Sequence, residues 1–265
     1  MRLFAVLALV GFAAASCGPA DALPDADPYV FILSGQSNMV GQGITAELPD
    51  DLTTLPANVR LFVDGAEVAV TDTPSFGPEV TFAHELAAAW PGRNIVLLKH
   101  AIGGTSLLAW SPDWDADLAA LTQNAGAGPL YEQLVDMVRG IDFGPSARYV
   151  GVLWMQGERD ARYPDVGAAY LENLDVFVTR LRADLGEAEL AFVLGQVNPP
   201  VERFPGADVV RAAQLEAAEV LPNTAAVDTS GLTKRDDDLH YDTAGELELG
   251  RRFARTFLAL VSASQ

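Results

Sequence analysis

The amino-acid sequence predicts an α/β protein in which one mainly parallel, doubly wound sheet is covered by helices on both faces. Short apolar runs without polar alternation recur along the 265 residues, as expected for strands buried on both faces. Segments with apolar residues at helical spacing separate these runs, and glycine or polar residues follow several of them directly. No internal repeat or linker interrupts residues 29–265, so a single domain is the simplest organisation.

The first 28 residues lie outside this domain. Leu3–Ala15 is too short to span a bilayer and is typical of a secretory signal peptide, and small residues then lead to Cys17, the only cysteine. This pattern resembles a bacterial lipoprotein signal in which Cys17 carries the lipid; ordinary signal cleavage is the alternative. We expect residues 1–17 to be the signal, residues 18–28 to be a tether, and the protein to be exported, either periplasmic or membrane-anchored.

The first predicted strand is Tyr29–Leu33, and Gly35 ends it because glycine permits a tight exit that few other residues adopt. Ser37 is expected in the following turn, with its hydroxyl directed out of the sheet. A loop rich in Gly, Pro, Asp and Thr comes next. The apolar runs 59–63 and 67–70, which flank Asp64-Gly65, then predict a β-hairpin.

Alternating helices and strands account for the rest of the domain. Pro78 and Glu79 favour the first turn of a helix that ends before Pro91-Gly92. The same criteria predict the remaining elements: strand 95–99, a helix around Leu130–Met137, strand 149–155, helix 166–185, strand 190–197, helix 207–221, strand 225–227 and a closing helix around Leu247–Val261.

The composition excludes several classes of function. Asp and Glu number 36 against 17 Lys and Arg, and the resulting net charge of −19 repels nucleic acid and anionic lipid head groups. A single cysteine allows no intrachain disulfide. No group of His, Cys and carboxylates has metal-ligand spacing and no glycine pattern fits a phosphate, so we expect neither a metal nor another cofactor.

Residues suited to acyl transfer follow the predicted strands and precede the last helix. Ser37 is the candidate nucleophile, His240 the candidate base, and Asp237 would orient the imidazole. The backbone N–H groups of Ser37 and Gly104 and the side-chain amide of Gln156 are candidate donors to an oxyanion. Because the carboxyl ends of parallel strands share one edge of a sheet, we expect these groups to meet there.

Other residues have alternative interpretations. His84 lies inside a predicted helix and His100 at a strand end, and we expect both to be structural. Glu158 is either a second carboxylate for the base or, as we favour, a hydrogen-bonding partner of neighbouring loops. Trp110 and Trp114 either stack on a sugar or pack over the loop that contains them.

Four sequence blocks resemble those of the SGNH hydrolases, most closely the branch with sialate O-acetylesterases and carbohydrate esterase family 6. They are Gly35-Gln36-Ser37-Asn38-Met39, Ala101-Ile102-Gly103-Gly104-Thr105-Ser106, Trp154-Met155-Gln156-Gly157-Glu158 and Asp237-Asp238-Leu239-His240. The resemblance implies a three-layer, flavodoxin-like α/β/α fold, no metal, and a serine esterase that removes acetyl groups from sugars. It also implies the roles given above: Ser37 as nucleophile, Asp237 and His240 as the rest of the triad, and Gly104 and Gln156 as oxyanion donors.

Two positions limit the resemblance. Arg159 stands where relatives usually carry serine, a departure that concerns the sugar subsites and not the triad. Met39 replaces the glycine that the nucleophile turn of α/β-hydrolases requires two residues after the serine, so that fold is set aside.

Three functions are therefore considered. The first is an esterase that acts on acetylated carbohydrates, of the sialate or xylan type. The others are a non-catalytic surface lipoprotein that binds a glycan and an esterase of small non-sugar esters. The joint presence of Ser37, Asp237 and His240 favours an enzyme.

Overall fold

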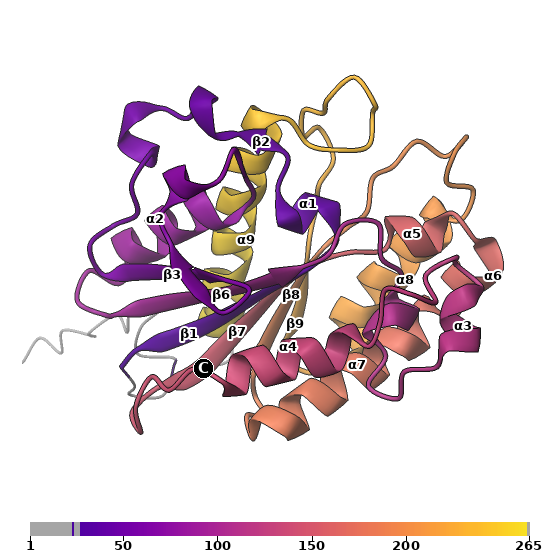
Figure 1. The fold of residues 1–265 in the computed structure, drawn as a ribbon, viewed down its shortest axis with the longest axis horizontal. Helices are drawn as coiled ribbons and strands as arrows, with labels where there is room; N and C mark the ends of the chain where they lie inside the picture. Colours follow the sequence, from indigo (N-terminus) through magenta and orange to yellow (C-terminus); the bar gives the residue numbers. More distant parts are fainter. Residues whose placement is uncertain (1–22, 24–26, 264–265) are drawn as a thin grey trace, which may run out of the picture.

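The computed structural model describes residue 23 and residues 27–263 (Figure 1). Within them, the main sheet has the strand order β4-β3-β6-β1-β7-β8-β9. All neighbouring strands in it are parallel except β3 and β4, which form the predicted hairpin. The strands are β1 (Tyr29–Gly35), β3 (Val59–Val63), β4 (Ala66–Val68), β6 (Ile95–Ala101), β7 (Arg148–Met155), β8 (Ala191–Gly195) and β9 (Thr224–Val227); β2 (Gly43–Ile44) and β5 (Ser75–Phe76) pair separately.

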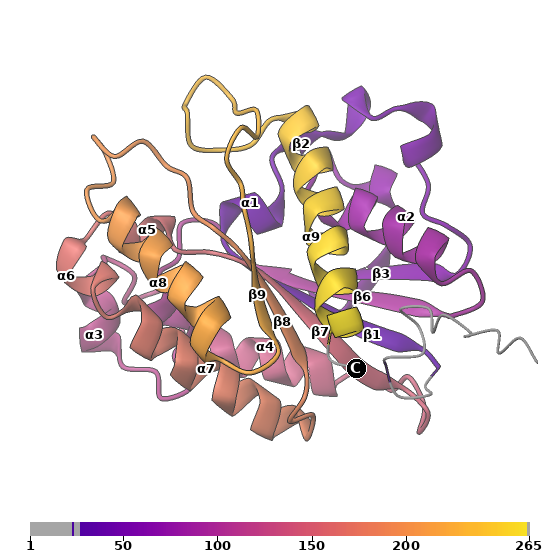
Figure 2. The same cartoon turned by 180° about the vertical axis from the view of Figure 1, so that it is seen from behind.

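Helices cover both faces of the sheet (Figures 1 and 2). One face carries α2 (Glu79–Ala89) and α9 (Thr243–Ala263), and the other carries α4 (Leu130–Arg139), α7 (Tyr170–Leu185) and α8 (Ala207–Val220). The short helical turns are α1 (Ser37–Val40), η2 (Thr45–Glu47), η3 (Asp50–Leu52), η4 (Val70–Asp72), η5 (Leu107–Trp110), α3 (Ala116–Ala120), α5 (Glu158–Ala161) and α6 (Pro164–Gly167).

The central strand β1 is buried throughout because both of its faces are covered. The ring of Phe31 packs edge-to-face on Phe82 of α2 and Phe257 of α9, at centroid distances of 5.3 and 4.9 Å. Its neighbours Val30 and Ile32 belong to the apolar cluster on the opposite face. Alternation along the strand therefore fills two cores, which confirms the predicted three-layer α/β fold.

Some predicted boundaries were wrong. Helix 166–185 is two helices, α6 and α7. The strand predicted over 67–70 ends at Val68, and the turn η4 begins two residues later. The turns α1, α3 and α5 were not predicted, because four or five residues are too few to show helical periodicity.

The topology opens the sheet at the end of β1. The chain first builds β3, β4 and β6 on one side of β1 and then crosses to β7, β8 and β9 on the other. The loops that leave β1 and its neighbours β6 and β7 consequently diverge, and such a switch point is where open α/β sheets place their ligands. Ser37 begins directly after it.

The predicted signal peptide, Cys17 and most of the tether lie outside the described residues. Among the residues described, no helix has the length and apolar character needed to cross a bilayer.

Candidate active site

The sharp exit from β1 depends on Gly35. Its φ of +141° belongs to a region that residues with a side chain rarely adopt, and an added Cβ would lie 2.1 Å from the carbonyl oxygen of Met155. The N–H of Gln36 donates to the same carbonyl at 2.8 Å, which ties the turn to β7. The turn makes Ser37 the first residue of α1, at the carboxyl edge of the sheet.

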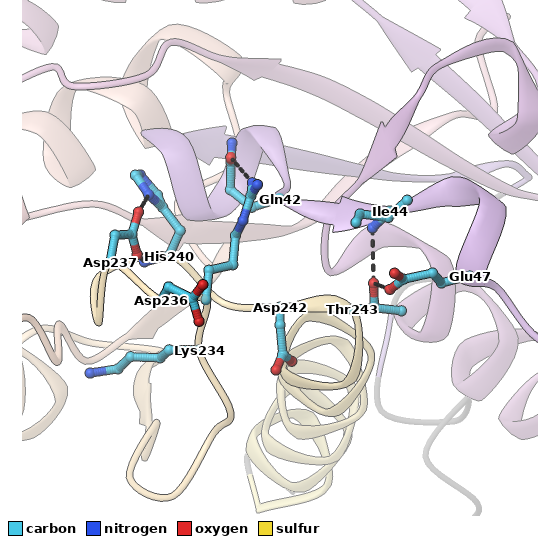
Figure 3. A pocket seen from close by; sticks show the side chains of 10 residues that line it. Gln42, Ile44, Glu47, Lys234, Asp236, Asp237, His240, Asp242 and Thr243 are labelled. Carbon is cyan, nitrogen blue, oxygen red and sulfur yellow. Dashed lines mark hydrogen bonds and ion pairs between the residues drawn. The ribbon is translucent and has the colours of Figure 1, made fainter.

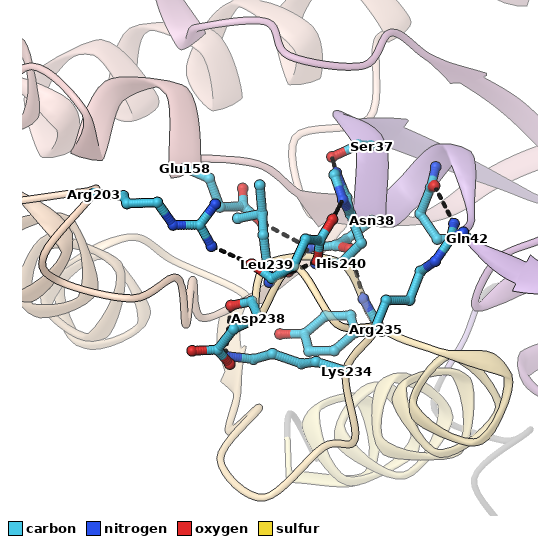
Figure 4. Close-up of polar contacts among 12 residues, drawn as sticks. Ser37, Asn38, Gln42, Glu158, Arg203, Lys234, Arg235, Asp238, Leu239 and His240 are labelled. Carbon is cyan, nitrogen blue, oxygen red and sulfur yellow. Dashed lines mark hydrogen bonds and ion pairs between the residues drawn. The ribbon is translucent and has the colours of Figure 1, made fainter.

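Ser37, His240 and Asp237 form a continuous hydrogen-bonded chain; Figure 3 shows His240 with Asp237, and Figure 4 shows Ser37 with His240. Oγ of Ser37 lies 2.9 Å from Nε2 of His240, and Nδ1 of the same ring lies 2.6 Å from Oδ2 of Asp237. The other carboxylate oxygen of Asp237 accepts hydrogen bonds of 2.9 Å from the N–H groups of Leu239 and His240. Residues 203 positions apart are thus in contact, as the sequence predicted.

The carboxylate of Asp237 is held in its ionised form. Partial burial alone would raise the pKa of Asp237. Hydrogen bonds from the N–H and the ring of His240 and from the N–H of Leu239 outweigh this effect and lower the pKa to about 2. An ionised acceptor on Nδ1 directs the ring proton to that nitrogen, which leaves the lone pair of Nε2 facing the hydroxyl of Ser37. Asp236 and Asp238 are both exposed, and Asp238 pairs with Lys234 at 3.2 Å.

The loop after β6 brings backbone donors to the nucleophile. The N–H of Ile102 donates to the carbonyl of Gly35 at 3.1 Å, and a Cβ added to Gly103 would lie 3.8 Å from Cβ of Ser37. Among the described residues, no acceptor engages the N–H of Ser37 or of Gly104. Two N–H groups, that of Ser37 itself and that of Gly104 in the loop that approaches it, are therefore unpaired within the described chain.

Gln156 differs from the prediction. Its side chain is fully buried, and Nε2 donates to the carbonyl of Thr105 at 3.0 Å and to Oδ2 of Asp160 at 2.5 Å. Both amide hydrogens are thus used inside the protein, so in this structure Gln156 offers no donor to an oxyanion. The prediction is corrected: the amide supports the loop that carries Gly104.

Asp160, which the sequence did not single out, anchors the same loop. Its carboxylate is fully buried and accepts hydrogen bonds from Oγ of Ser106 at 2.9 Å and from the N–H of Leu107 at 3.1 Å. Burial nevertheless raises the pKa of Asp160 to about 6, because these bonds compensate only part of the lost solvation. Ser106 and Asp160 lie 54 positions apart and share no periodic pattern, so sequence reasoning had no means of finding this contact.

The remaining candidates make no hydrogen bond to the serine hydroxyl. Nδ1 of His100 contacts Asp64 at 2.7 Å, and His84 contacts the carbonyl of Thr54 at 3.1 Å. Trp110 is fully buried against Trp154, with ring centroids 5.5 Å apart, and so cannot stack on a sugar. Of the other two, Trp114 is half-buried, and Arg159 donates through Nε to the carbonyl of Thr122 at 2.8 Å.

A polar groove of about 780 Å³ adjoins the triad (Figure 3). His240 and Asp237 form part of its wall, and the other walls come from the segment after α1 and from the start of α9. It is lined by Gln42, Ile44, Glu47, Lys234, Arg235, Asp236, Asp237, His240, Asp242 and Thr243. Within the part of the chain that the structure describes, no three His, Cys, Asp or Glu side chains are grouped as metal ligands.

Comparison with known proteins places the chain among carbohydrate esterases. Residues 28–259 match the family described as carbohydrate esterase, sialic acid-specific acetylesterase. A probable carbohydrate esterase from Arabidopsis thaliana is 26% identical over 259 residues, which cover 87% of this chain and 90% of the relative.

Solved structures share the fold. A protein from Arabidopsis thaliana superimposes with a TM-score of 0.73 at 24% identity, covering 88% of this chain and 98% of that one. A carbohydrate acetylesterase from Xanthomonas citri superimposes with a TM-score of 0.70 at 22% identity, covering 89% of this chain and 57% of that one. NanS superimposes with a TM-score of 0.65 at 17% identity, covering 91% of this chain and 98% of that one.

The family match spans nearly the whole described domain, from the residue before β1 to the last turns of α9. It includes every residue of the hydrogen-bonded chain and of the groove beside it. The chain therefore belongs to the sialic acid-specific acetylesterase family of carbohydrate esterases, and it is a carboxylic ester hydrolase.

Proposed function

We propose that this protein removes O-acetyl groups from carbohydrates by acyl transfer through Ser37. The observation that carries the proposal is the hydrogen-bonded chain from Oγ of Ser37 to Nε2 of His240 and from Nδ1 to Asp237. A serine hydroxyl becomes nucleophilic when a neutral imidazole can take its proton, and this chain provides that imidazole in the required orientation.

In the first half of the reaction, Oγ of Ser37 attacks the carbonyl carbon of the acetyl ester while Nε2 of His240 takes the hydroxyl proton. The tetrahedral oxyanion is stabilised by the N–H groups of Ser37 and Gly104, which have no acceptor within the described chain. When the intermediate collapses, the bond to the sugar oxygen breaks and His240 returns the proton to that oxygen. An acetyl-serine remains on the enzyme.

The second half repeats these steps with water. His240 takes a proton from the water, the resulting hydroxyl attacks the acetyl carbon, and the bond to Oγ of Ser37 breaks as that oxygen regains its proton. Acetate leaves and the free enzyme is restored. Asp237 keeps its charge throughout and stabilises the imidazolium that forms in each half.

The groove beside His240 is the proposed sugar subsite, because His240 must reach the oxygen of the departing sugar. Its acidic residues Glu47, Asp236, Asp237 and Asp242 outnumber the basic Lys234 and Arg235, and Lys234 is paired with Asp238. Like charges repel, so we propose a preference for neutral acetylated sugars, such as xylan-type esters, over anionic O-acetyl sialate.

The test is acetate release from acetylated xylan oligosaccharides, O-acetyl sialic acid and p-nitrophenyl acetate, by the wild type and by Ser37→Ala. We expect turnover by the wild type and a loss on the order of 10³-fold or more in the variant, with the fold intact by circular dichroism. Wild-type activity in Ser37→Ala would end the nucleophile assignment. Absence of turnover with retained glycan binding would favour the binding lipoprotein, and activity on p-nitrophenyl acetate alone would favour a non-sugar esterase.

The charge preference has its own control. If kcat/KM were higher for the sialate ester than for the neutral ester, and Arg235→Gln removed that difference, Arg235 would instead be assigned to the recognition of a carboxylate. Arg235 is exposed and donates to Oε1 of Gln42 at 3.2 Å, so its replacement removes no buried contact.

We also propose that the protein is exported and carries a lipid on Cys17. The described chain enters the domain at the amino end of β1, and Ser37 follows the carboxyl end of that strand, so a lipid-bearing segment would join the domain at the edge opposite Ser37. Mass spectrometry of the mature N-terminus tests this: an acylated Cys17 supports the anchor, and an unmodified one supports simple secretion.

A further inference from the structure

A second carboxylate lies close to His240, and the reaction above gives it no part. Glu158 is the first residue of α5 and is only 2% exposed. Its Oε1 accepts a hydrogen bond of 2.9 Å from Nδ2 of Asn38, and its Oε2 is buried without a hydrogen-bond partner among the described residues. Figure 4 shows both side chains beside the loop that carries His240.

Asn38 contacts the main chain on both sides of His240. Its Oδ1 accepts a hydrogen bond of 3.2 Å from the N–H of Tyr241, and its Nδ2 approaches the carbonyl of Leu239 at 3.4 Å. Asn38 is also the residue directly after Ser37 in α1. One buried amide thus connects the nucleophile's own helix to both neighbours of the base.

Glu158 decides which way this amide points. A carboxylate only accepts hydrogen bonds, so it holds Nδ2 of Asn38 on its own side and leaves Oδ1 for the N–H of Tyr241. If the amide were reversed, its oxygen would face the carboxylate and its NH₂ would face the N–H of Tyr241. Both contacts would then be repulsive.

Glu158 is not hydrogen-bonded to the imidazole. Nδ1 of His240 is occupied by Asp237 and Nε2 by Ser37. Of the two roles considered from the sequence, the geometry therefore favours contact with a neighbouring loop over a place in the triad.

We propose that Asn38 and Glu158 form a clamp that positions His240 against Ser37, with Glu158 acting through Asn38. Glu158 is thus a positioning residue, and the inference rests on the proposed function because it takes His240 as the base. The clamp holds the buried side of this loop, whereas Asp236 and Asp238 are exposed and the side chain of Asp237 is 41% exposed.

The test uses p-nitrophenyl acetate with Asn38→Ala, Glu158→Gln and Glu158→Leu. A displacement of about 1 Å in a catalytic group costs about 10²-fold, so we expect kcat of Asn38→Ala and Glu158→Leu to fall by about that factor. KM should stay within about threefold, since the ester does not touch the clamp. Glu158→Gln should keep kcat within about threefold, because its Oε1 still accepts from Asn38.

A double variant and a control complete the design. Two residues that act as one unit are non-additive, so Asn38→Ala with Glu158→Leu should be no slower than Asn38→Ala alone. The matched control is Asn58→Ala, which removes an amide that donates to the carbonyl of Arg93 at 2.8 Å beside the amino end of β3. It should cost stability without changing kcat.

Two results would overturn the clamp. If Glu158→Gln is as slow as Glu158→Leu, the charge of Glu158 matters and the hydrogen bond does not. If the two single effects multiply in the double variant, the residues act independently. Should Glu158→Leu fail to fold, Asn38→Ala and Glu158→Gln decide alone. A separate result, wild-type activity in Ser37→Ala, would refute the proposed function.

Discussion

The buried carboxylate of Asp160 should make the fold more stable in mild acid. In an unfolded chain it titrates near its ordinary value of 3.8, whereas burial raises its pKa in the fold to about 6. The fold therefore binds the proton more tightly than the unfolded chain does. Stability from this residue is complete below about pH 4 and is lost as the pH rises through about 6.

The size of the effect follows from the two pKa values. One pH unit corresponds to about 1.4 kcal/mol, so the difference between 3.8 and about 6 gives about 3 kcal/mol. Because Asp160 is fully buried, solvent screens little of this. For a chain of this size 1 kcal/mol moves Tm by about 2–4 °C, so the contribution is about 6–12 °C.

The assay is urea unfolding of the wild type and of Asp160→Asn between pH 4 and 7.5. Other acids, including Glu158 and Glu246 whose pKa values burial also raises, are present in both proteins and cancel in the difference. The wild type should gain about 3 kcal/mol more than the variant as the pH is lowered. Asp165→Asn, an exposed change nearby, should follow the wild type. Parallel curves for the wild type and Asp160→Asn would refute the reasoning.

Three further outcomes are expected. Asp237→Asn should lower kcat by about 10³ to 10⁴-fold, because an amide no longer holds the ring of His240 in the required tautomer; a loss below tenfold in ester turnover would argue against Asp237 as the orienting group. Activity should fall from pH 8 to pH 5, since an imidazolium cannot take the serine proton, and a flat kcat profile over that range would exclude a histidine base. Lys99→Met should cost about 3–5 kcal/mol in urea unfolding, because it leaves the buried carboxylate of Glu79, now 2.7 Å from Nζ of Lys99, unpaired; a variant as stable as the wild type would show that Glu79 is readily neutralised.

The sequence was sufficient to predict features that depend on local pattern. The apolar run of β1 followed by Gly35 predicted both the strand and its turn, because burial on two faces and a positive φ each restrict the residue types allowed. The spacing of Asp237 and His240 predicted their contact, since three residues are enough for a compact turn to align the two side chains. Resemblance to a known family supplied the substrate class.

Features that depend on orientation were not predictable. The type and place of Gln156 suggested a donor at the sheet edge, but its direction is set by Thr105 and Asp160, which only the folded chain brings near it. The contact between Asn38 and Glu158 spans 120 positions and shows no periodicity. Trp110 likewise lies in a predicted loop, but its side chain is buried in the core.

With His240 as the proposed base, the distance along the chain between Ser37 and His240 also determines when a newly made chain can first hydrolyse an ester. The base is supplied just before α9, whose packing on α2 and on the last two strands closes the domain. Under the proposed mechanism, a nascent chain of which only the first 230 residues have been released presents a serine without a proton acceptor. We therefore expect hydrolysis to begin only after the last helix has docked, and incomplete chains should not cleave esters.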